Sequence, residues 1–185
     1  MHAWHAWIAV QPTLAAGRIE FPKGLDPFSI ALAWHIAAGL VAVACGLIAA
    51  TAPKRPGRHP RFGRRYLWAI GVLCVTAGVM GVLRWPRDVH LLVIGTIAAA
   101  GATTGHLARR RRRPGWLRWH IVGMSTSLIA LFTAFYVDNG PNLPVWDRLP
   151  PLSFWVLPSA VGLPLMLRAL ARHAPSRTHA GRKPG

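Results

Sequence analysis

Long apolar runs alternate with short basic clusters along most of this chain. A helix needs roughly 17–25 mostly apolar residues to cross a bilayer, and the first four runs meet that requirement. The fifth run is shorter and contains Pro158 and Pro164, so we expect a kinked span that its flanking residues extend. The pattern predicts an all-α membrane bundle of five transmembrane helices. The five runs are residues 28–52, 66–83, 89–108, 117–137 and 152–167.

The two ends of the chain differ from the predicted transmembrane domain, which we place at residues 28–170. Residues 1–27 begin with two copies of the tripeptide His-Ala-Trp after the initial Met. They lack the early basic residue and the unbroken apolar stretch of a signal peptide. Tryptophan is enriched at the headgroup level of bilayers, so we interpret this part as an external interfacial segment. Residues 171–185 form a basic cytoplasmic tail in this interpretation.

Basic residues are divided unequally between the two sides of the predicted bundle. Of the 22 Lys and Arg residues, 17 lie in the first loop, the third loop and the C-terminal tail. Basic residues collect on the cytoplasmic side of membrane proteins, which predicts an external N-terminus and a cytoplasmic C-terminus. Clusters such as residues 54–65 also attract anionic lipid headgroups. The alternative for these clusters is that they only set the topology.

The composition favours a membrane protein over a nucleic-acid-binding protein. A net charge of +17 would suit a nucleic-acid partner, but the basic residues sit between apolar runs rather than along one stripe. Charged residues make up 15% of the chain, whereas a typical soluble domain has about 25%. We therefore predict that the protein lies in a lipid bilayer and has no nucleic-acid partner. Another membrane protein is a candidate partner.

The sequence carries none of the common catalytic signatures that have a recognisable spacing. It contains no HExxH, GxSxG, Walker or CxxC motif, so a familiar hydrolase or NTPase is not expected. The predicted spans contain no Asp or Glu, which disfavours a proton relay or an ion-coupled transporter. Cys45 and Cys74 lie inside apolar runs and are expected to be small packing residues. Whether the protein is an enzyme stays open.

Histidines are the remaining candidates for chemistry within the apolar runs. His35 lies about two turns into the first run, where an ionisable side chain marks a candidate functional site. The alternative is a neutral imidazole bonded to a neighbouring helix. His35 with His90 would form an outer site for b-type haem or a metal ion, and His106 with His120 would form an inner one.

A model with two stacked haems conflicts with the spacing in the third run. His90 and His106 are sixteen residues apart, which is about 160° around a helix. They face nearly opposite sides, so a single site fits better. The simpler alternative is that His90, His106 and His120 are interfacial residues at helix ends.

One face of the fourth run combines polar and sulfur-containing side chains. His120, Met124 and Ser127 follow i, i+4, i+7 spacing and therefore share a face. They would line a pocket or form a mixed packing face. In the first basic loop, His59 lies among six cations, and a neutral imidazole there would be able to bind a metal ion or a headgroup. Gly101 and Gly105 form a GxxxG pair, which predicts close helix packing.

Two motifs link these candidates to a known family. One is His-x-x-x-Gly-x-x-Tyr, and the other is His-x-x-x-Met-x-x-Ser on the fourth run. With the surrounding segments, WHIAAGLVAVACGLIAA and PKRPGRHPRFGRRY among them, residues 28–170 resemble the DUF2306 family of predicted bacterial membrane proteins. The family often has Arg after the loop histidine, where this chain has Pro60. The motifs fall on His59, Gly63 and Tyr66, and on His120, Met124 and Ser127.

The resemblance implies a multi-pass protein of the bacterial plasma membrane, and it implies no reaction. Together with the pattern above, it makes His35, His59, Tyr66, His120, Met124 and Ser127 the ligand-binding candidates. Three function classes remain open. The first is a binding or transport-type protein for a small molecule or lipid, which we favour. The others are a b-type haem or quinone-linked redox protein, and a non-catalytic subunit or assembly factor of a membrane complex.

Overall fold

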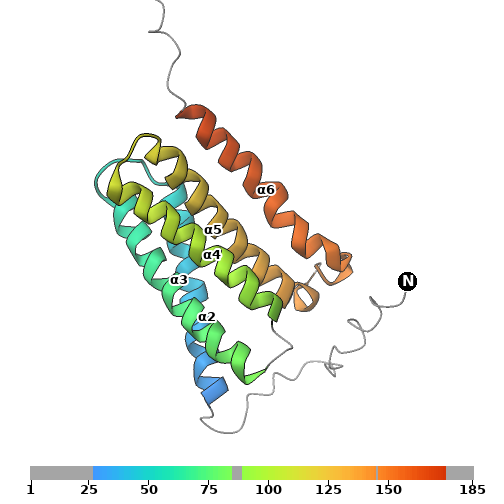
Figure 1. Ribbon diagram of the computed structural model, residues 1–185. Coiled ribbons are helices and arrows are strands. Elements are labelled where there is room, and N and C mark those ends of the chain that lie inside the picture. Colours follow the sequence, from blue (N-terminus) through green and yellow to red (C-terminus); the bar gives the residue numbers. More distant parts are fainter. Residues whose placement is uncertain (1–26, 85–88, 145, 174–185) are drawn as a thin grey trace, which may run out of the picture.

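The computed structural model describes residues 27–84, 89–144 and 146–173, and these residues are almost entirely helical. Each of the five long helices has the length and composition needed to cross a membrane, which confirms the predicted all-α bundle and indicates a multi-pass membrane protein. Two short 3-10 turns, η1 (Gly140–Asn142) and η2 (Trp146–Arg148), connect the last two helices. The long helices are α2 (Pro27–Thr51), α3 (Arg58–Leu83), α4 (Val89–Arg111), α5 (Trp116–Asn139) and α6 (Pro151–Arg172) (Figure 1).

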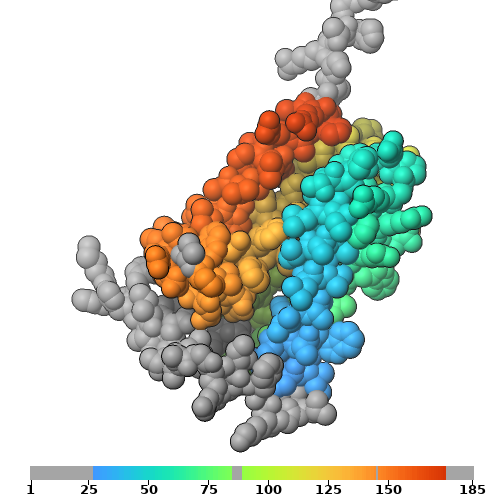
Figure 2. Space-filling view, turned by 180° about the vertical axis from the view of Figure 1, so that it is seen from behind, coloured from blue at the N-terminus to red at the C-terminus, as the bar shows by residue number. Residues whose placement is uncertain are grey.

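The helices pack as two hairpins with a fifth helix added on one side. Helices α2 and α3 form the first hairpin, α4 and α5 form the second, and α3 joins the two by packing against α4. Helix α6 packs against α5. In the space-filling view, α6 and α2 lie on either side of α5 (Figure 2). The α2–α3 and α4–α5 connections lie at the same end of the bundle. We call this the basic end, because both connections carry clusters of basic residues.

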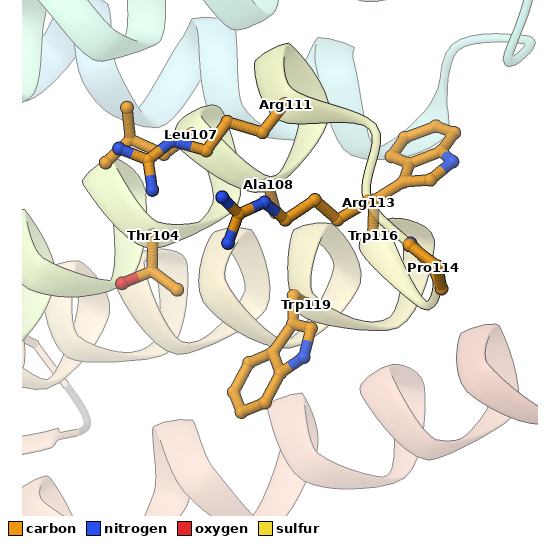
Figure 3. A pocket seen from close by; sticks show the side chains of 8 residues that line it. All are labelled: Thr104, Leu107, Ala108, Arg111, Arg113, Pro114, Trp116 and Trp119. Carbon is orange, nitrogen blue, oxygen red and sulfur yellow. The ribbon is translucent and has the colours of Figure 1, made fainter.

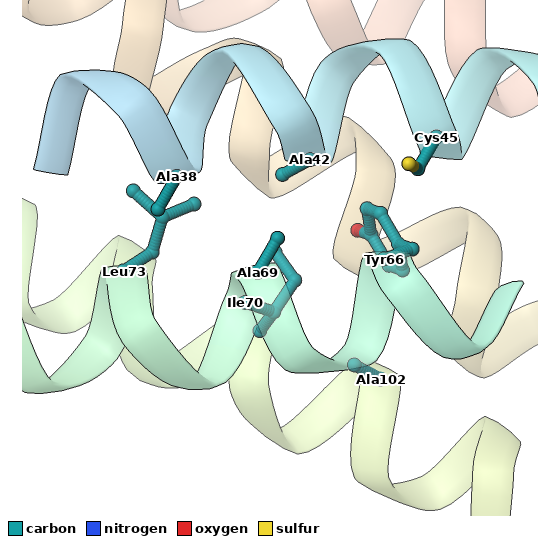
Figure 4. Packing of buried hydrophobic residues seen from close by; sticks show 8 residues of the cluster. All are labelled: Ala38, Ala42, Cys45, Tyr66, Ala69, Ile70, Leu73 and Ala102. Atoms are coloured by element: carbon teal, nitrogen blue, oxygen red, sulfur yellow. The ribbon is translucent and has the colours of Figure 1, made fainter. Parts of the chain in front are cut away.

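Small residues set the close contact between α2 and α3. From Ala38 to Ala49, buried positions on α2 recur at spacings of four, three and four through Ala42 and Cys45, which places them on one face toward α3. Larger apolar side chains on α2, such as Trp34 at 63% and Leu40 at 69% exposure, point outward, as expected for a surface in contact with lipid. The buried cluster between the helices consists of Ala38, Ala42, Cys45, Tyr66, Ala69, Ile70, Leu73 and Ala102 (Figure 4).

Three glycines bring the backbones of α4 and α5 into contact. A Cβ atom added to Gly123 would lie 2.6 Å from the Gly101 carbonyl oxygen and 2.6 Å from the Gly105 nitrogen. A Cβ on Gly101 would lie 2.8 Å from the Gly123 carbonyl oxygen. Only glycine fits a crossing this close. The predicted packing role of Gly101 and Gly105 is therefore confirmed, and Gly123 is their partner on the facing helix.

The largest boundary error concerns the start of α3. The apolar pattern placed it at Tyr66, whereas the helix begins at Arg58. Pro60 is tolerated because it lies in the first turn, where a backbone N–H has no partner within the helix. Phe62 packs against the buried cluster and anchors this turn. Placing His59 in a loop was therefore wrong, because it lies on the first turn of α3.

Helix α6 also accommodates proline, in this case within its interior. It runs through both Pro158 and Pro164, and it extends from Pro151 to Arg172. The apolar run alone predicted residues 152–167. The expected contribution of the flanking residues is therefore confirmed. Most of the predicted external segment and most of the basic tail lie outside the described ranges.

Candidate functional site

Two histidines from different hairpins meet at the basic end. The ring centroids of His59 and His120 are 6.2 Å apart, and their planes make an angle of 82° in an edge-on contact. His59 lies on the first turn of α3, and His120 lies on the second turn of α5. Both side chains are half-buried. We call these two residues the histidine pair.

Backbone carbonyl groups orient both rings in the same way. His59 Nδ1 donates to the Ala49 carbonyl oxygen at 2.8 Å, and His120 Nδ1 donates to the Gly105 carbonyl oxygen at 2.8 Å. A carbonyl oxygen only accepts, so the proton is on Nδ1 in both rings. In the neutral form, Nε2 then carries the lone pair. The histidine pair thus offers two acceptor nitrogens whose orientation the helices fix.

Two cations surround the histidine pair. The Lys54 ammonium donates to the carbonyl oxygens of Ala49 at 2.9 Å and Ala50 at 2.7 Å, and so caps the end of α2. Partial burial lowers the pKa of the Lys54 ammonium from its usual value. Lys54 and Arg109 both lie close enough to act electrostatically on the two imidazole rings. The surroundings therefore favour an anionic ligand over a metal cation.

A second contact joins the same two helices deeper in the bundle. The Tyr66 hydroxyl and the Ser127 hydroxyl lie 2.7 Å apart in a hydrogen bond, and the two residues are 1% and 0% exposed. Each residue follows its histidine by seven positions, which is two turns or about 10 Å along the helix. Helices α3 and α5 are thus linked by two polar contacts, one above the other.

The structure brings together five of the six predicted ligand-binding residues. His59 and Tyr66 lie on α3, and the predicted face of α5 supplies the other three. Met124 packs against Gly105 of α4, where its Sδ atom would be 3.0 Å from an added Cβ. Met124 also packs against the buried cluster that contains Tyr66. The inner pairing expected for His120 involved His106, whereas the ring beside His120 is that of His59.

His35 lies apart from the histidine pair and the Tyr66–Ser127 contact, which together form one polar centre. His35 belongs to a second polar centre. Its Nδ1 lies 2.9 Å from the Thr76 hydroxyl of α3, in agreement with the alternative of an imidazole bonded to a neighbouring helix. Asp138 acts electrostatically on the same ring. This acidic neighbour was not predicted, because the apolar run of α5 ended before Asp138. His90 lies elsewhere, with its ring centroid 6.3 Å from that of Trp155 on α6. A haem or metal site between His35 and His90 stays a prediction.

An apolar layer separates the two polar centres. Tyr66 and Thr76 are ten residues apart on α3, or about 15 Å along the helix. Between them lie Ala69, Ile70 and Leu73, packed against small residues of α2 (Figure 4). Across the described ranges, no group of three or more His, Cys, Asp or Glu side chains is placed to hold a metal ion.

Sequence reasoning missed three residues at the site. Lys54 and Arg109 were counted only as part of basic clusters, although their charge acts on the histidine pair. Trp116 also contacts His120, with ring centroids 6.3 Å apart. Its place four residues before His120 on the same helix was the available signal. In comparisons with known proteins, no family model, curated protein or solved structure matches this chain.

Proposed function

We propose that this protein binds, and in the manner of a carrier moves, a small molecule or lipid whose acidic polar group sits at the basic end. The observation that carries the proposal is the histidine pair, in which both Nδ1 atoms are committed to carbonyl groups. The Nε2 atoms would accept hydrogen bonds from hydroxyl groups of the ligand, the protonated oxygen of a singly ionised acid among them. Lys54 and Arg109 would offset its negative charge.

The surroundings of the pair support an amphiphilic ligand. The pair lies at the end of helices whose outer surfaces are apolar over most of their length. A polar group bound there leaves the rest of the molecule next to lipid-facing side chains. Burial against those side chains stabilises binding by roughly 25 cal/mol for each Å² of apolar surface removed from water.

We expect His59→Ala and His120→Ala each to reduce ligand retention at least tenfold. Loss of one hydrogen bond to a charged group corresponds to roughly ten- to a hundredfold in affinity. Wild-type and variant proteins would be purified in lipid nanodiscs, and the extracted molecules would be compared by mass spectrometry. His173→Ala is the matched control, because His173 Nδ1 also donates to a backbone carbonyl but lies exposed at the end of α6.

Two results would contradict this proposal. One is equal retention of every extracted molecule by wild type, His59→Ala and His120→Ala. The other is an equal loss in the His173→Ala control. Circular dichroism of each variant would show that its helices remain intact.

The redox alternative has one observation in its favour. A histidine that binds a metal commonly donates its other ring nitrogen to a carbonyl group, as both members of the histidine pair do. An absorption spectrum of the purified protein separates the alternatives. A Soret band that disappears in His59→Ala would establish b-type haem and replace the binding proposal.

We also infer membership of the DUF2306 family. What supports it is that the two resembling motifs meet in space. The histidines that begin the motifs are in contact, and Tyr66 and Ser127, which end them, share a hydrogen bond. The family would place the protein in a bacterial plasma membrane.

We propose an external N-terminus and a cytoplasmic basic end. The support is that both basic connections lie at one end of the bundle, where the positive-inside rule predicts the cytoplasm. A reporter that works only in the cytoplasm is expected to be active when it is fused after Gly185. One inserted near Pro144, in the α5–α6 connection, is expected to read external. An external C-terminus would overturn this orientation.

A further inference from the structure

An open pocket of about 380 Å³ lies beside the α4–α5 connection at the basic end (Figure 3). Its walls come from the last turns of α4, the connection itself and the first turns of α5. Gly115 adopts a left-handed conformation with φ 76° as the chain turns into α5. This tight turn leaves the two helix ends close together, with basic and aromatic side chains on the same side. The principal lining residues are Thr104, Leu107, Arg111, Arg113, Trp116 and Trp119.

The pocket combines positive charge with aromatic rings. The side chains of Arg111 and Arg113 extend back along α4, so that their guanidinium groups lie toward Thr104 and Ala108. Guanidinium groups bind phosphate oxygens through paired hydrogen bonds. Trp119 closes another side of the pocket. Indole rings favour the headgroup level of a bilayer, which is where the end of a spanning helix lies.

The size of the pocket limits what can enter. Ligand pockets commonly range from roughly 300 to 1,000 Å³, so 380 Å³ is near the lower end. A headgroup fits, and the acyl chains must remain outside. Leu107 and Trp119, which are 38% and 61% exposed, continue the apolar surface next to the pocket. Acyl chains would lie along that surface.

We propose that this pocket binds the phosphate group of an anionic phospholipid from the surrounding bilayer. Arg111 and Arg113 hold the phosphate, Trp119 contacts the glycerol region, and Leu107 contacts the start of an acyl chain. The lipid is distinct from the ligand of the histidine pair, and this inference does not rest on the proposed function. Trp116 lies between the two sites, since it lines the pocket and contacts His120.

The test compares two double variants that remove equal charge from the same run. Arg111→Gln/Arg113→Gln changes the pocket, whereas Arg110→Gln/Arg112→Gln changes neighbours that do not line it. Binding of phosphatidylglycerol to the full-length protein in detergent would be measured by native mass spectrometry, with phosphatidylcholine as the comparison lipid. We expect the first double variant to weaken phosphatidylglycerol binding about 30-fold, which is the combined effect of two basic residues at a membrane surface.

The control variant is expected to change binding less than threefold, although its net charge is the same. Soluble glycerol 3-phosphate at millimolar concentration should not displace the lipid, because it lacks acyl chains. Equal weakening in both double variants would show a general charge effect and overturn the assignment. Displacement by glycerol 3-phosphate would also overturn it, in favour of a soluble phosphate ligand.

Discussion

Gly123→Ala is expected to lower the free energy of unfolding by about 3 kcal/mol. The added methyl group would lie 2.6 Å from backbone atoms of both Gly101 and Gly105. Backbone atoms cannot move aside as a flexible side chain can, so α4 and α5 must separate along their crossing. Separation would also weaken the contacts that hold His120 and Ser127 in place. The loss would be measured from helix content during unfolding in mixed micelles of increasing dodecyl sulfate content.

Gly95→Ala is the matched control for that prediction. Gly95 is also a glycine within a spanning helix, but no atom outside its immediate surroundings lies within 4 Å of an added Cβ. Alanine favours helix more than glycine does, so this variant should unfold at the same or a slightly higher detergent fraction. Equal stability of Gly123→Ala and Gly95→Ala would mean that the α4–α5 crossing is wider than the structure shows.

Tyr66→Ala is expected to destabilise the bundle by about 4 kcal/mol, the usual cost of removing a buried aromatic ring. The Tyr66 side chain belongs to the buried cluster between α2 and α3, and its ring lies against Gly46. Tyr66→Phe keeps the ring and removes only the hydroxyl. We expect it to cost about 1 kcal/mol, since hydrogen bonds between membrane helices are individually weak.

A double-mutant cycle tests whether Tyr66 and Ser127 act together. The hydrogen bond between their hydroxyl groups is the contact being measured. If it contributes to stability, Ser127→Ala should destabilise the wild type more than it destabilises Tyr66→Phe. The same unfolding assay gives all four values. Strict additivity would show that the two hydroxyl groups make no joint contribution.

The number and class of the helices were predictable because lipid imposes a simple requirement. A spanning segment must be apolar and helical over a fixed length, and five runs met this condition. The start of α3 was not predictable from the same rule. Arg58 to Arg65 are too polar for a hydropathy pattern, but arginine is a good helix former and Phe62 reaches the buried cluster. Charged residues mark where a helix leaves the hydrocarbon core of the bilayer, and the helix itself can continue beyond that point.

The candidate residues were predictable one helix at a time, and their pairing was not. Spacing placed His120, Met124 and Ser127 on one face, but it carries no information about which helix lies opposite. That depends on how α4 crosses α5, and the crossing depends on Gly123, which no pattern marked. In the folded bundle, side chains of α3 reach those of α5. His59, and not His106, is therefore the neighbour of His120. The packing of the helices also determines that the Asp138 carboxylate lies near enough to act on His35.

The apolar layer between Tyr66 and Thr76 has a consequence for any membrane that carries an electrical potential. Moving one elementary charge through a potential of 100 mV involves about 2.3 kcal/mol, and a chain of polar groups through a bundle would let protons discharge that potential. Here small and aliphatic side chains of α2 and α3 fill the interface between these helices over about 15 Å along the helix axis. Along this interface, a proton at the histidine pair would therefore exchange with the basic end and not with His35. A proton leak between α2 and α3 is therefore not expected when the bundle lies in a membrane that carries a potential.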